Sequence, residues 1–259
     1  MKDRLRKRFL QQRLWNEMGR RFAFFLILGV MLQGLAPLPA PEPQRVTIED
    51  FERYPVGAYP DRWRFLTSNR EFLPLSAIMQ ERKECRVRQE AQNKFLRCIT
   101  RGEALRITLA NREDFGLDWD LRQHSRLRWR WRAEHLPAGA REDSRRWNDS
   151  GGAVYVTFGT DWLGRPISIK YTYSALLPVE ATVDYGVLKV LVVSSGIEGI
   201  GSWVVVERDV VADYRRLFGK EPPARPLSLT LWSDSDNTKD YAIVDFDDFE
   251  LLPAITAVR

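Results

Sequence analysis

The sequence predicts an all-β fold, a two-sheet antiparallel sandwich of jelly-roll type with one short helix. About twelve segments between residues 46 and 252 alternate apolar and polar residues with the period of two that a half-buried strand requires. After residue 46, only the segment from Asp209 or Ala212 to Phe218 has apolar residues at helical spacing, and Gly219 and two prolines follow it. Strands do not alternate with helices along the chain, so a parallel sheet with crossover helices is not expected.

The expected strands follow one another with short connections. Residues 174–188 and 196–201 are expected to be loops, because they lack a sustained alternation. We expect the first and last strands to lie side by side, which would close the sandwich. The strand segments include residues 46–51, 85–89, 94–98, 104–110, 126–133, 151–159, 166–174, 187–195, 202–210, 227–232 and 241–252.

The start of the chain has the pattern of an export signal. Residues 1–21 carry eight Lys and Arg, and FAFFLILGVMLQGLA follows directly. This apolar run is shorter than the roughly 20 residues that span a bilayer, but prolines follow both possible cleavage positions. We therefore expect residues 1–40 to be a signal peptide or an N-terminal hydrophobic anchor helix, and 41–45 to be a Pro-rich linker. Residues 46–253 then form one sandwich domain on the periplasmic side of the inner membrane, anchored or released.

The basic balance of the chain belongs to this leader. The whole sequence has a formal net charge of +5, from 40 Lys and Arg against 35 Asp and Glu. Without residues 1–36 there remain 32 basic and 33 acidic side chains. Nucleic-acid binding needs a concentrated basic surface, so it is not expected of the domain.

Cys85 and Cys98 are the only cysteines and lie in two strand-like runs, ECRVRQE and NKFLRC. The symmetric hairpin register pairs Val87 with Leu96 and sets Cys85 opposite Cys98. We expect a disulfide in an oxidising compartment. The alternative is a pair of buried thiols that act as small apolar residues. A zinc site is excluded, because two cysteines and two scattered histidines lack ligand spacing.

The clearest alternation is RLRWRWRA, at residues 126–133. Leucine and two tryptophans fall on one face, and four arginines fall on the other. Such a face is either solvated and paired with acids on neighbouring strands, or it is a groove for an anionic or polyhydroxylated ligand, since guanidinium groups match paired oxygens. In the second case Arg128 and Arg130 are the candidate ligand-binding residues.

An acidic turn, SDSDNTKD, joins the two last strands. Its side chains either close the turn through hydrogen bonds to the backbone or hold a ligand. Because three acids in one short turn repel each other, we favour a ligand-binding role for Asp234 and Asp236, together with Asn237. Asp149 precedes another core strand and could meet them across one sheet.

Tryptophans are either core residues or platforms for sugar rings. Trp203 is flanked by valines and is expected in the core. Trp147 lies two residues before Asp149, and Trp232 lies beside the acidic turn. These two are the candidate exposed, ligand-lining tryptophans.

Few kinds of catalysis fit the sequence. It has no GxSxG motif, too few histidines for a Ser-His-Asp relay, and no Gly-rich loop that opens a helix. Paired carboxylates at Asp149, Asp234 and Asp236 remain an option. No cofactor or metal site is predicted, although a structural calcium ion at Glu52 and Asp247 is an alternative.

DSDNT after a short strand, followed by a strand that ends in Asp and Phe, resembles the end of a bacterial family known as domain of unknown function 3047. The resemblance covers roughly residues 46–252 and confers no activity. One departure is WNDSGG, which has a single Asp where the resemblance leads us to expect a pair. Further stretches similar to the family are FERYPVGAYPDRW (51–63), RLRWRWRAEHLP (126–137), NDSGGAVYVTFG (148–159) and GSWVVVERDVVADYRRLFGKEPP (201–223).

The expected function is that of an exported, non-catalytic module that binds a glycan or another anionic, polyhydroxylated ligand of the cell envelope. The alternatives are a carboxylate-dependent glycoside hydrolase or lyase, and a structural subunit that docks on an envelope complex. Two carboxyl groups about 5–10 Å apart across an open cleft would favour hydrolysis. A shallow groove with Trp and Arg would favour binding, and a large exposed apolar patch would favour docking.

Overall fold

A computed structural model describes residues 44–255 of the chain. The signal or anchor expected at residues 1–40 and most of the linker lie outside the described residues. Within the described part, no helix has the length and apolar character needed to cross a membrane.

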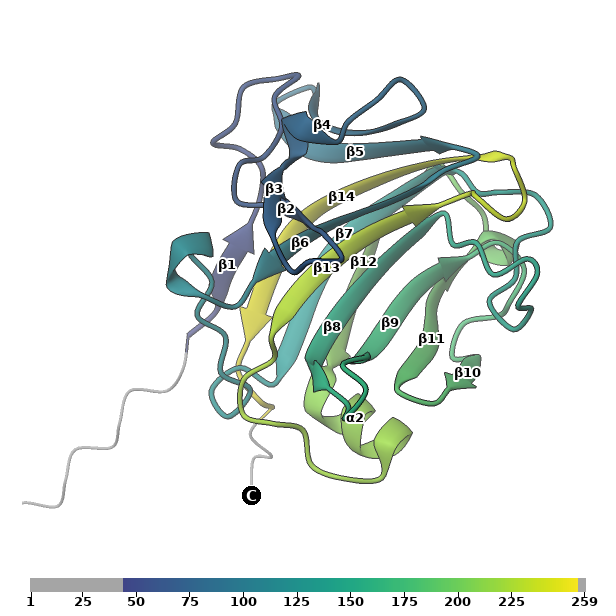
Figure 1. Cartoon of the computed structure of the whole chain (residues 1–259). Coiled ribbons are helices and arrows are strands. Elements are labelled where there is room, and N and C mark those ends of the chain that lie inside the picture. The colour runs from purple at the N-terminus through teal and green to yellow at the C-terminus, as the bar shows by residue number, and fades with distance from the viewer. Residues whose placement is uncertain (1–43, 256–259) are drawn as a thin grey trace, which may run out of the picture. The chain divides into compact units, whose positions relative to one another are not determined.

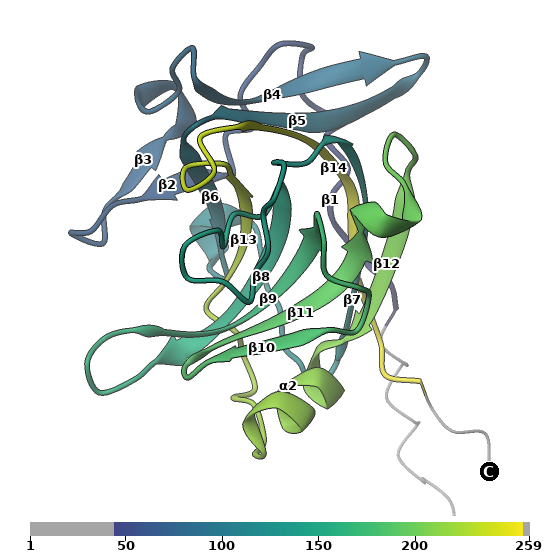
Figure 2. The same cartoon turned by 90° about the vertical axis from the view of Figure 1, so that its right-hand side faces the viewer.

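The described residues form two β-sheets that pack face to face, as Figures 1 and 2 show. The smaller sheet contains, in spatial order, β12 (Val204–Asp209), β7 (Arg126–His135), β14 (Tyr241–Leu252), β5 (Asn93–Arg101) and β4 (Lys83–Glu90), and β1 (Val46–Glu49) also pairs with β14. The larger sheet contains β10 (Thr182–Tyr185), β11 (Leu188–Ser195), β9 (Pro166–Ser174), β8 (Gly152–Thr160), β13 (Ser228–Asp234), β6 (Ala104–Ala110), β2 (Arg64–Leu66) and β3 (Phe72–Pro74). The predicted two-sheet β-sandwich is therefore confirmed.

Short helical segments connect some of these strands. Three are 3₁₀ turns, η1 (Leu75–Ala77), η2 (Glu113–Phe115) and η3 (Gly196–Glu198). In the part of the chain that the structure describes there is one α-helix, α2 (Val210–Phe218), and a helix was predicted at this place. Asp209 begins it, because its carboxylate accepts the N–H of Ala212, and Gly219 ends it with a left-handed φ of 68°.

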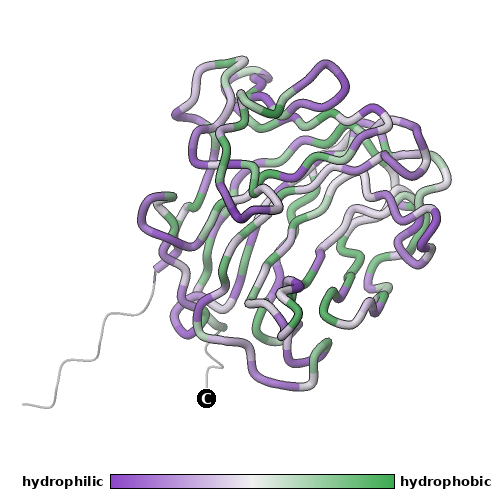
Figure 3. The backbone as a smooth tube through the Cα atoms, in the orientation of Figure 1, coloured by the Kyte–Doolittle hydropathy of each residue, from purple (hydrophilic) through white to green (hydrophobic). Residues whose placement is uncertain are grey.

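The core lies between the sheets and follows from the alternation of the strands (Figure 3). Trp129 and Trp131 of β7 face Tyr171 and Tyr173 of β9, with ring centroids 5.7 and 5.4 Å apart. All four side chains are buried. Full burial of one such side chain contributes about 1.5–3 kcal/mol, so these rings are a large part of what holds the two sheets together.

Two predictions about strand pairing are confirmed. β1 runs antiparallel to β14, so the first and last strands lie side by side. In the β4–β5 hairpin Val87 is opposite Leu96 and Cys85 is opposite Cys98. The two cysteines form a disulfide, with their Cα atoms 4.0 Å apart.

The prediction of a purely antiparallel sandwich is wrong at one pair, because β9 and β11 are parallel. The segment 174–188, expected as a loop, contains β10, which forms the edge of the sheet. The chain passes from β9 to this edge, turns at Gly186 and returns as β11 between the two. The burial of the strands explains the order. In β11 the three consecutive residues Val190 to Val192 are all buried, so both faces of this strand are covered, as in the interior of a sheet. In β10 exposed residues alternate with half-buried ones, as in a strand at the edge of a sheet.

Candidate functional site

Four neighbouring strands of the larger sheet, β9, β8, β13 and β6, present aromatic and charged side chains on the face that points away from the core. Tyr155 of β8 and Lys170 of β9 are directly opposite each other in the ladder. Trp232 of β13 lies beside Tyr155, with ring centroids 5.3 Å apart. The guanidinium of Arg106, from β6, lies 5.7 Å from the centre of the Trp232 ring. We call these four residues the outer-face cluster.

Lys170 is the unusual member of the cluster. Its side chain is only 6% exposed, yet within residues 44–255 no carboxylate oxygen lies within 4.0 Å of its ammonium. Burial acts to lower the pKa of Lys170, but Tyr155, Glu142 and Asp234 outweigh burial, so the pKa is raised and the group stays charged. Its direct partner is the hydroxyl of Tyr155 and not a carboxylate. A buried charge without an ion-pair partner is costly and is characteristic of functional sites.

Three acids meet at one end of this cluster. Asp149, Asp234 and Asp236 each offer a carboxylate oxygen, and these oxygens lie within 4.8 Å of one another. Burial raises the pKa of Asp234 to about 7, Lys170 acts against the rise, and Asp149 and Asp236 add to it. The predicted meeting of the three acids is therefore found, and Asp234 gains or loses its proton near neutral pH. The oxygens are also close enough to surround a cation, which the sequence did not indicate.

Two of the predicted residues hold the turn together. Asp149 is 1% exposed and accepts the backbone N–H groups of Asn237 at 3.0 Å and of Thr238 at 2.7 Å. The amide of Asn237 donates to Asn148. The oxygens of Asp149 are occupied in this way. Asp234 and Asp236 are half-buried, and Asp234 accepts the backbone N–H of Asp236 at 3.4 Å.

The loop between β7 and β8 crosses the same face of the sheet and closes one end of the site (Figure 2). Its Glu142 is 1% exposed and accepts hydrogen bonds from the hydroxyls of Ser150, Thr172 and Ser174 at 3.0, 2.8 and 2.5 Å. Two of these hydroxyls belong to β9. Glu142 therefore attaches the β7–β8 loop to β9, the strand that carries Lys170.

Sequence reasoning missed Tyr155, Lys170, Arg106 and Glu142. Tyr155 and Lys170 occupy polar positions in the alternating segments VYVTF and SIKYT. That pattern predicts outward side chains, but it does not predict that the two strands are neighbours. Lys170 is the one charged residue of the strand PISIKYTYS, and this was the one available signal.

Trp147 lies in the β7–β8 loop and is 38% exposed. The guanidinium of Arg146 lies 4.8 Å from the centre of its ring. Trp147 is thus exposed as expected, but it is associated with its chain neighbour, whereas Trp232 belongs to the outer-face cluster.

Arg128 and Arg130 are on the other side of the molecule, because β7 belongs to the smaller sheet. Arg128 contacts Glu250 at 3.1 Å, and Arg130 contacts Asp247 at 2.6 Å and Asp248 at 2.9 Å. The interpretation as a polar face with acids on a neighbouring strand is confirmed. The structure does not bring these arginines to the acidic turn, because β7 and β13 belong to different sheets.

The prediction that Trp203 lies in the core is wrong. Trp203 is partly exposed and lies over the arginine face, 4.8 Å from the guanidinium of Arg130 and 4.9 Å from that of Arg132. The reason is the register of β12, in which Val204 is opposite Trp131. Val204 therefore faces inward, and the preceding tryptophan faces outward.

The two acids considered for a calcium ion have protein partners instead. Glu52 accepts the backbone N–H of Lys94 at 2.7 Å. Asp247 accepts from the amide of Asn93 at 2.9 Å and from Arg130. Within the described residues these two acids do not form a group that could hold a metal ion.

Comparison with known proteins identifies the family. A model for the family described as "Protein of unknown function (DUF3047)" matches residues 75–250. The chain belongs to the DUF3047 family. The resemblance noted in the sequence is thereby confirmed over the matched residues. A comparison of this DUF3047 member with curated protein sequences found no match.

Two solved structures are similar to this DUF3047 member. One is the family 11 carbohydrate-binding module of the cellulosomal cellulase Lic26A-Cel5E of Clostridium thermocellum, with 9% identity, a TM-score of 0.40, and coverage of 83% of this chain and 98% of that chain. The other is the family 30 carbohydrate-binding module of the cellulosomal cellulase Cel9D-Cel44B of the same organism, with 12% identity, a TM-score of 0.43, and coverage of 82% and 99%. Identities this low do not transfer a ligand from one protein to another.

Proposed function

We propose that this chain is a non-catalytic module that binds a glycan on the outer face of its larger sheet. The observation that carries the proposal is the buried Lys170, which has no carboxylate within 4.0 Å among the described residues and lies beside the rings of Tyr155 and Trp232. Sugar rings have apolar faces that pack on aromatic rings. Their hydroxyls accept hydrogen bonds from an ammonium and donate to a carboxylate, so one sugar can satisfy both charged groups.

Glycoside hydrolysis is the second candidate. A general acid needs a pKa near the working pH, and the pKa of Asp234, raised by burial to about 7, meets this condition. However, hydrolysis needs two carboxyl groups that flank the scissile bond. Asp236 follows Asp234 in the same turn, and Asp149 is bound by the turn. The acids thus lie on one side of the site, which favours binding over cleavage.

The test is a glycan array probed with the full chain and two variants, Trp232→Ala and Lys170→Met. We expect binding to at least one glycan class, and a loss of about tenfold or more in affinity in each variant, since a stacked ring or a charged hydrogen bond contributes about 1.5 kcal/mol or more. Trp162→Ala is the matched control, because Trp162 is 88% exposed and lies between β8 and β9.

Several outcomes separate the candidates. Release of reducing ends from a bound glycan, lost in Asp234→Asn, would replace the binding proposal with hydrolysis. Unchanged binding in both Trp232→Ala and Lys170→Met, or no binding to any glycan on the array, would reject the outer-face cluster as the site. Circular dichroism of each variant shows whether the fold is intact.

We also propose that the chain is exported and works on the periplasmic side of the inner membrane, anchored or released. The basic block and the apolar run at residues 22–36 support export. The Cys85–Cys98 disulfide supports it independently, because such bonds persist in oxidising compartments. Cell fractionation tests the location. N-terminal sequencing that begins at Pro37 or Pro41 would show release by cleavage, and recovery of the protein in the cytoplasmic fraction would contradict export.

A further inference from the structure

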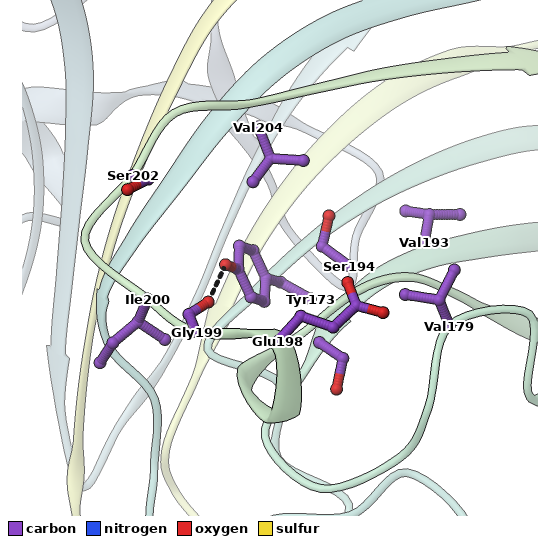
Figure 4. Close-up of a pocket in the computed structure, with 10 residues that line it drawn as sticks. Tyr173, Val179, Val193, Ser194, Glu198, Gly199, Ile200, Ser202 and Val204 are labelled. Atoms are coloured by element: carbon purple, nitrogen blue, oxygen red, sulfur yellow. Dashed lines mark hydrogen bonds between the residues drawn. The ribbon is translucent and has the colours of Figure 1, made fainter.

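A pocket of about 460 Å³ opens between the two sheets, at the side where β11 and η3 approach β12 (Figure 4). Its volume lies in the range of small-molecule sites. It is distinct from the outer-face cluster, because Tyr173 of β9 lies on the inner face of its sheet and Lys170 on the outer face. The residues that line the pocket are Tyr173, Val179, Val193, Ser194, Ser195, Glu198, Gly199, Ile200, Ser202 and Val204.

The wall of the pocket is mixed: four aliphatic side chains and one aromatic ring lie beside three serines and one glutamate. Val179, Val193 and Val204 contribute side chains from a loop, from β11 and from β12. The hydroxyl of Tyr173 donates to the backbone oxygen of Gly199 at 3.0 Å, which fixes the ring in place (Figure 4). An apolar group of a few carbon atoms fits such a wall.

One carboxylate faces this wall. In Figure 4 the side chain of Glu198 extends over the same space as Tyr173, Ser194 and Val179. The pKa of Tyr173 is raised by burial and also by the negative charge of Glu198, which places that charge close to the ring. In the part of the chain that the structure describes, no Lys, Arg or His lies within 4.0 Å of the Glu198 carboxylate. The pocket therefore combines aliphatic side chains, serine hydroxyls and an aromatic ring with the carboxylate of Glu198, an exposed residue that has no cation of the described part of the protein beside it.

We propose that this pocket binds a small organic cation, an alkylammonium. Its alkyl chain would pack on the valines, and its ammonium would pair with Glu198 and lie against the ring of Tyr173. Charge-assisted hydrogen bonds and cation–π contacts are the interactions that such a pair of groups provides. The chemistry selects against anions of the same shape, because the only charge that the protein places in the pocket is negative.

The experiment is isothermal titration of the full chain with three probes of equal chain length, n-hexylammonium, 1-hexanol and hexanoate. We expect hexylammonium to bind about tenfold more tightly than hexanol, since a hydrogen bond to a charged group contributes about 1.5 kcal/mol or more. Hexanoate should bind most weakly. Glu198→Gln should abolish the preference for hexylammonium while hexanol binding stays the same.

Two further variants complete the test. Glu81→Gln changes an exposed acid outside the pocket and should leave all three affinities as they are. Val179→Phe fills the pocket from a loop and should weaken all three probes. Equal affinities for the three probes, unchanged hexylammonium binding in Glu198→Gln, or no binding of any probe would each overturn the proposal. None of these results depends on glycan binding, so the two proposals fail separately.

Discussion

Asp149 and Thr238 are 89 residues apart in the chain, yet one oxygen of the Asp149 carboxylate accepts both the backbone N–H of Thr238, at 2.7 Å, and its hydroxyl, at 2.6 Å. This contact ties the β7–β8 loop to the turn between β13 and β14. The other oxygen accepts the N–H of Asn237. The acid that holds Asn237 and Thr238 therefore comes from outside the turn. Within the turn, Asp234 accepts the backbone N–H of Asp236 at 3.4 Å.

The first prediction concerns stability. Asp149→Ala leaves two backbone N–H groups and a hydroxyl without their acceptor, so we expect the free energy of unfolding to fall by about 2–3 kcal/mol. Asp236→Asn is the control and should change it by no more than about 0.5 kcal/mol. Chemical denaturation of both variants measures the difference. Equal losses in the two variants would show that Asp236 also closes the turn.

The second prediction concerns pH. Because burial raises the pKa of Asp234 to about 7 in the folded state, against about 3.9 when unfolded, the folded protein binds the extra proton between these values. The contribution of Asp234 to stability is therefore fully present below about pH 4, declines as pH rises from about 4 to about 7, and is lost above. Asp234→Asn should remove this decline.

Thermal unfolding of both proteins between pH 4.5 and 8 measures this effect. Asp247, whose pKa burial raises to about 6, contributes a similar decline, but it does so in both proteins and cancels in the difference. A difference between wild type and variant that does not change with pH would show that Asp234 titrates at its ordinary pKa.

The third prediction concerns the disulfide. The bond between Cys85 and Cys98 closes a loop with a sequence separation of 13 residues, so we expect its loss in the double variant Cys85→Ala and Cys98→Ala to cost roughly 3 kcal/mol. Intact mass after alkylation, with and without reductant, detects the bond. Alkylation of both thiols without reductant, in protein taken from the periplasm, would contradict it.

The fourth prediction separates the two outer faces. Asp245 is fully buried and contacts Arg97 at 2.6 Å and Arg132 at 2.9 Å. Asp245→Ala leaves both guanidiniums without this partner, and we expect it to cost about 3–5 kcal/mol in stability. Glycan affinity, measured below the melting temperature of the variant, should not change. A folded Asp245→Ala protein that no longer binds glycan would place the site on the arginine face.

The alternation of apolar and polar residues was sufficient to predict most of the strands. In β7 the period of two separated the tryptophans from the arginines, because successive side chains of a strand point to opposite faces. The helix ends were visible at Asp209 and Gly219, since capping depends on adjacent residues. The pairing of Cys85 with Cys98 was also local, because the short turn of the hairpin determines its register.

These patterns involve residues that are close in the sequence, and they do not determine which strands are neighbours in a sheet. The parallel pairing of β9 with β11 depends on β10 taking the edge of the sheet, and β10 has only four residues. The strands β2 and β3 have three residues each and carry no periodic signal. Pairing at long sequence separation is decided by how the whole sheet buries its apolar faces.

The same distinction applies to the candidate site. The sequence identified Asp234 and Trp232 as surface candidates, because both lie in or beside a polar turn. It also placed Arg128 and Arg130 in the same groove, although β7 and β13 belong to different sheets. Lys170 contacts Tyr155 only because β9 lies beside β8. The pattern of a strand determines which way a side chain points, whereas the packing of distant segments determines which residues it contacts.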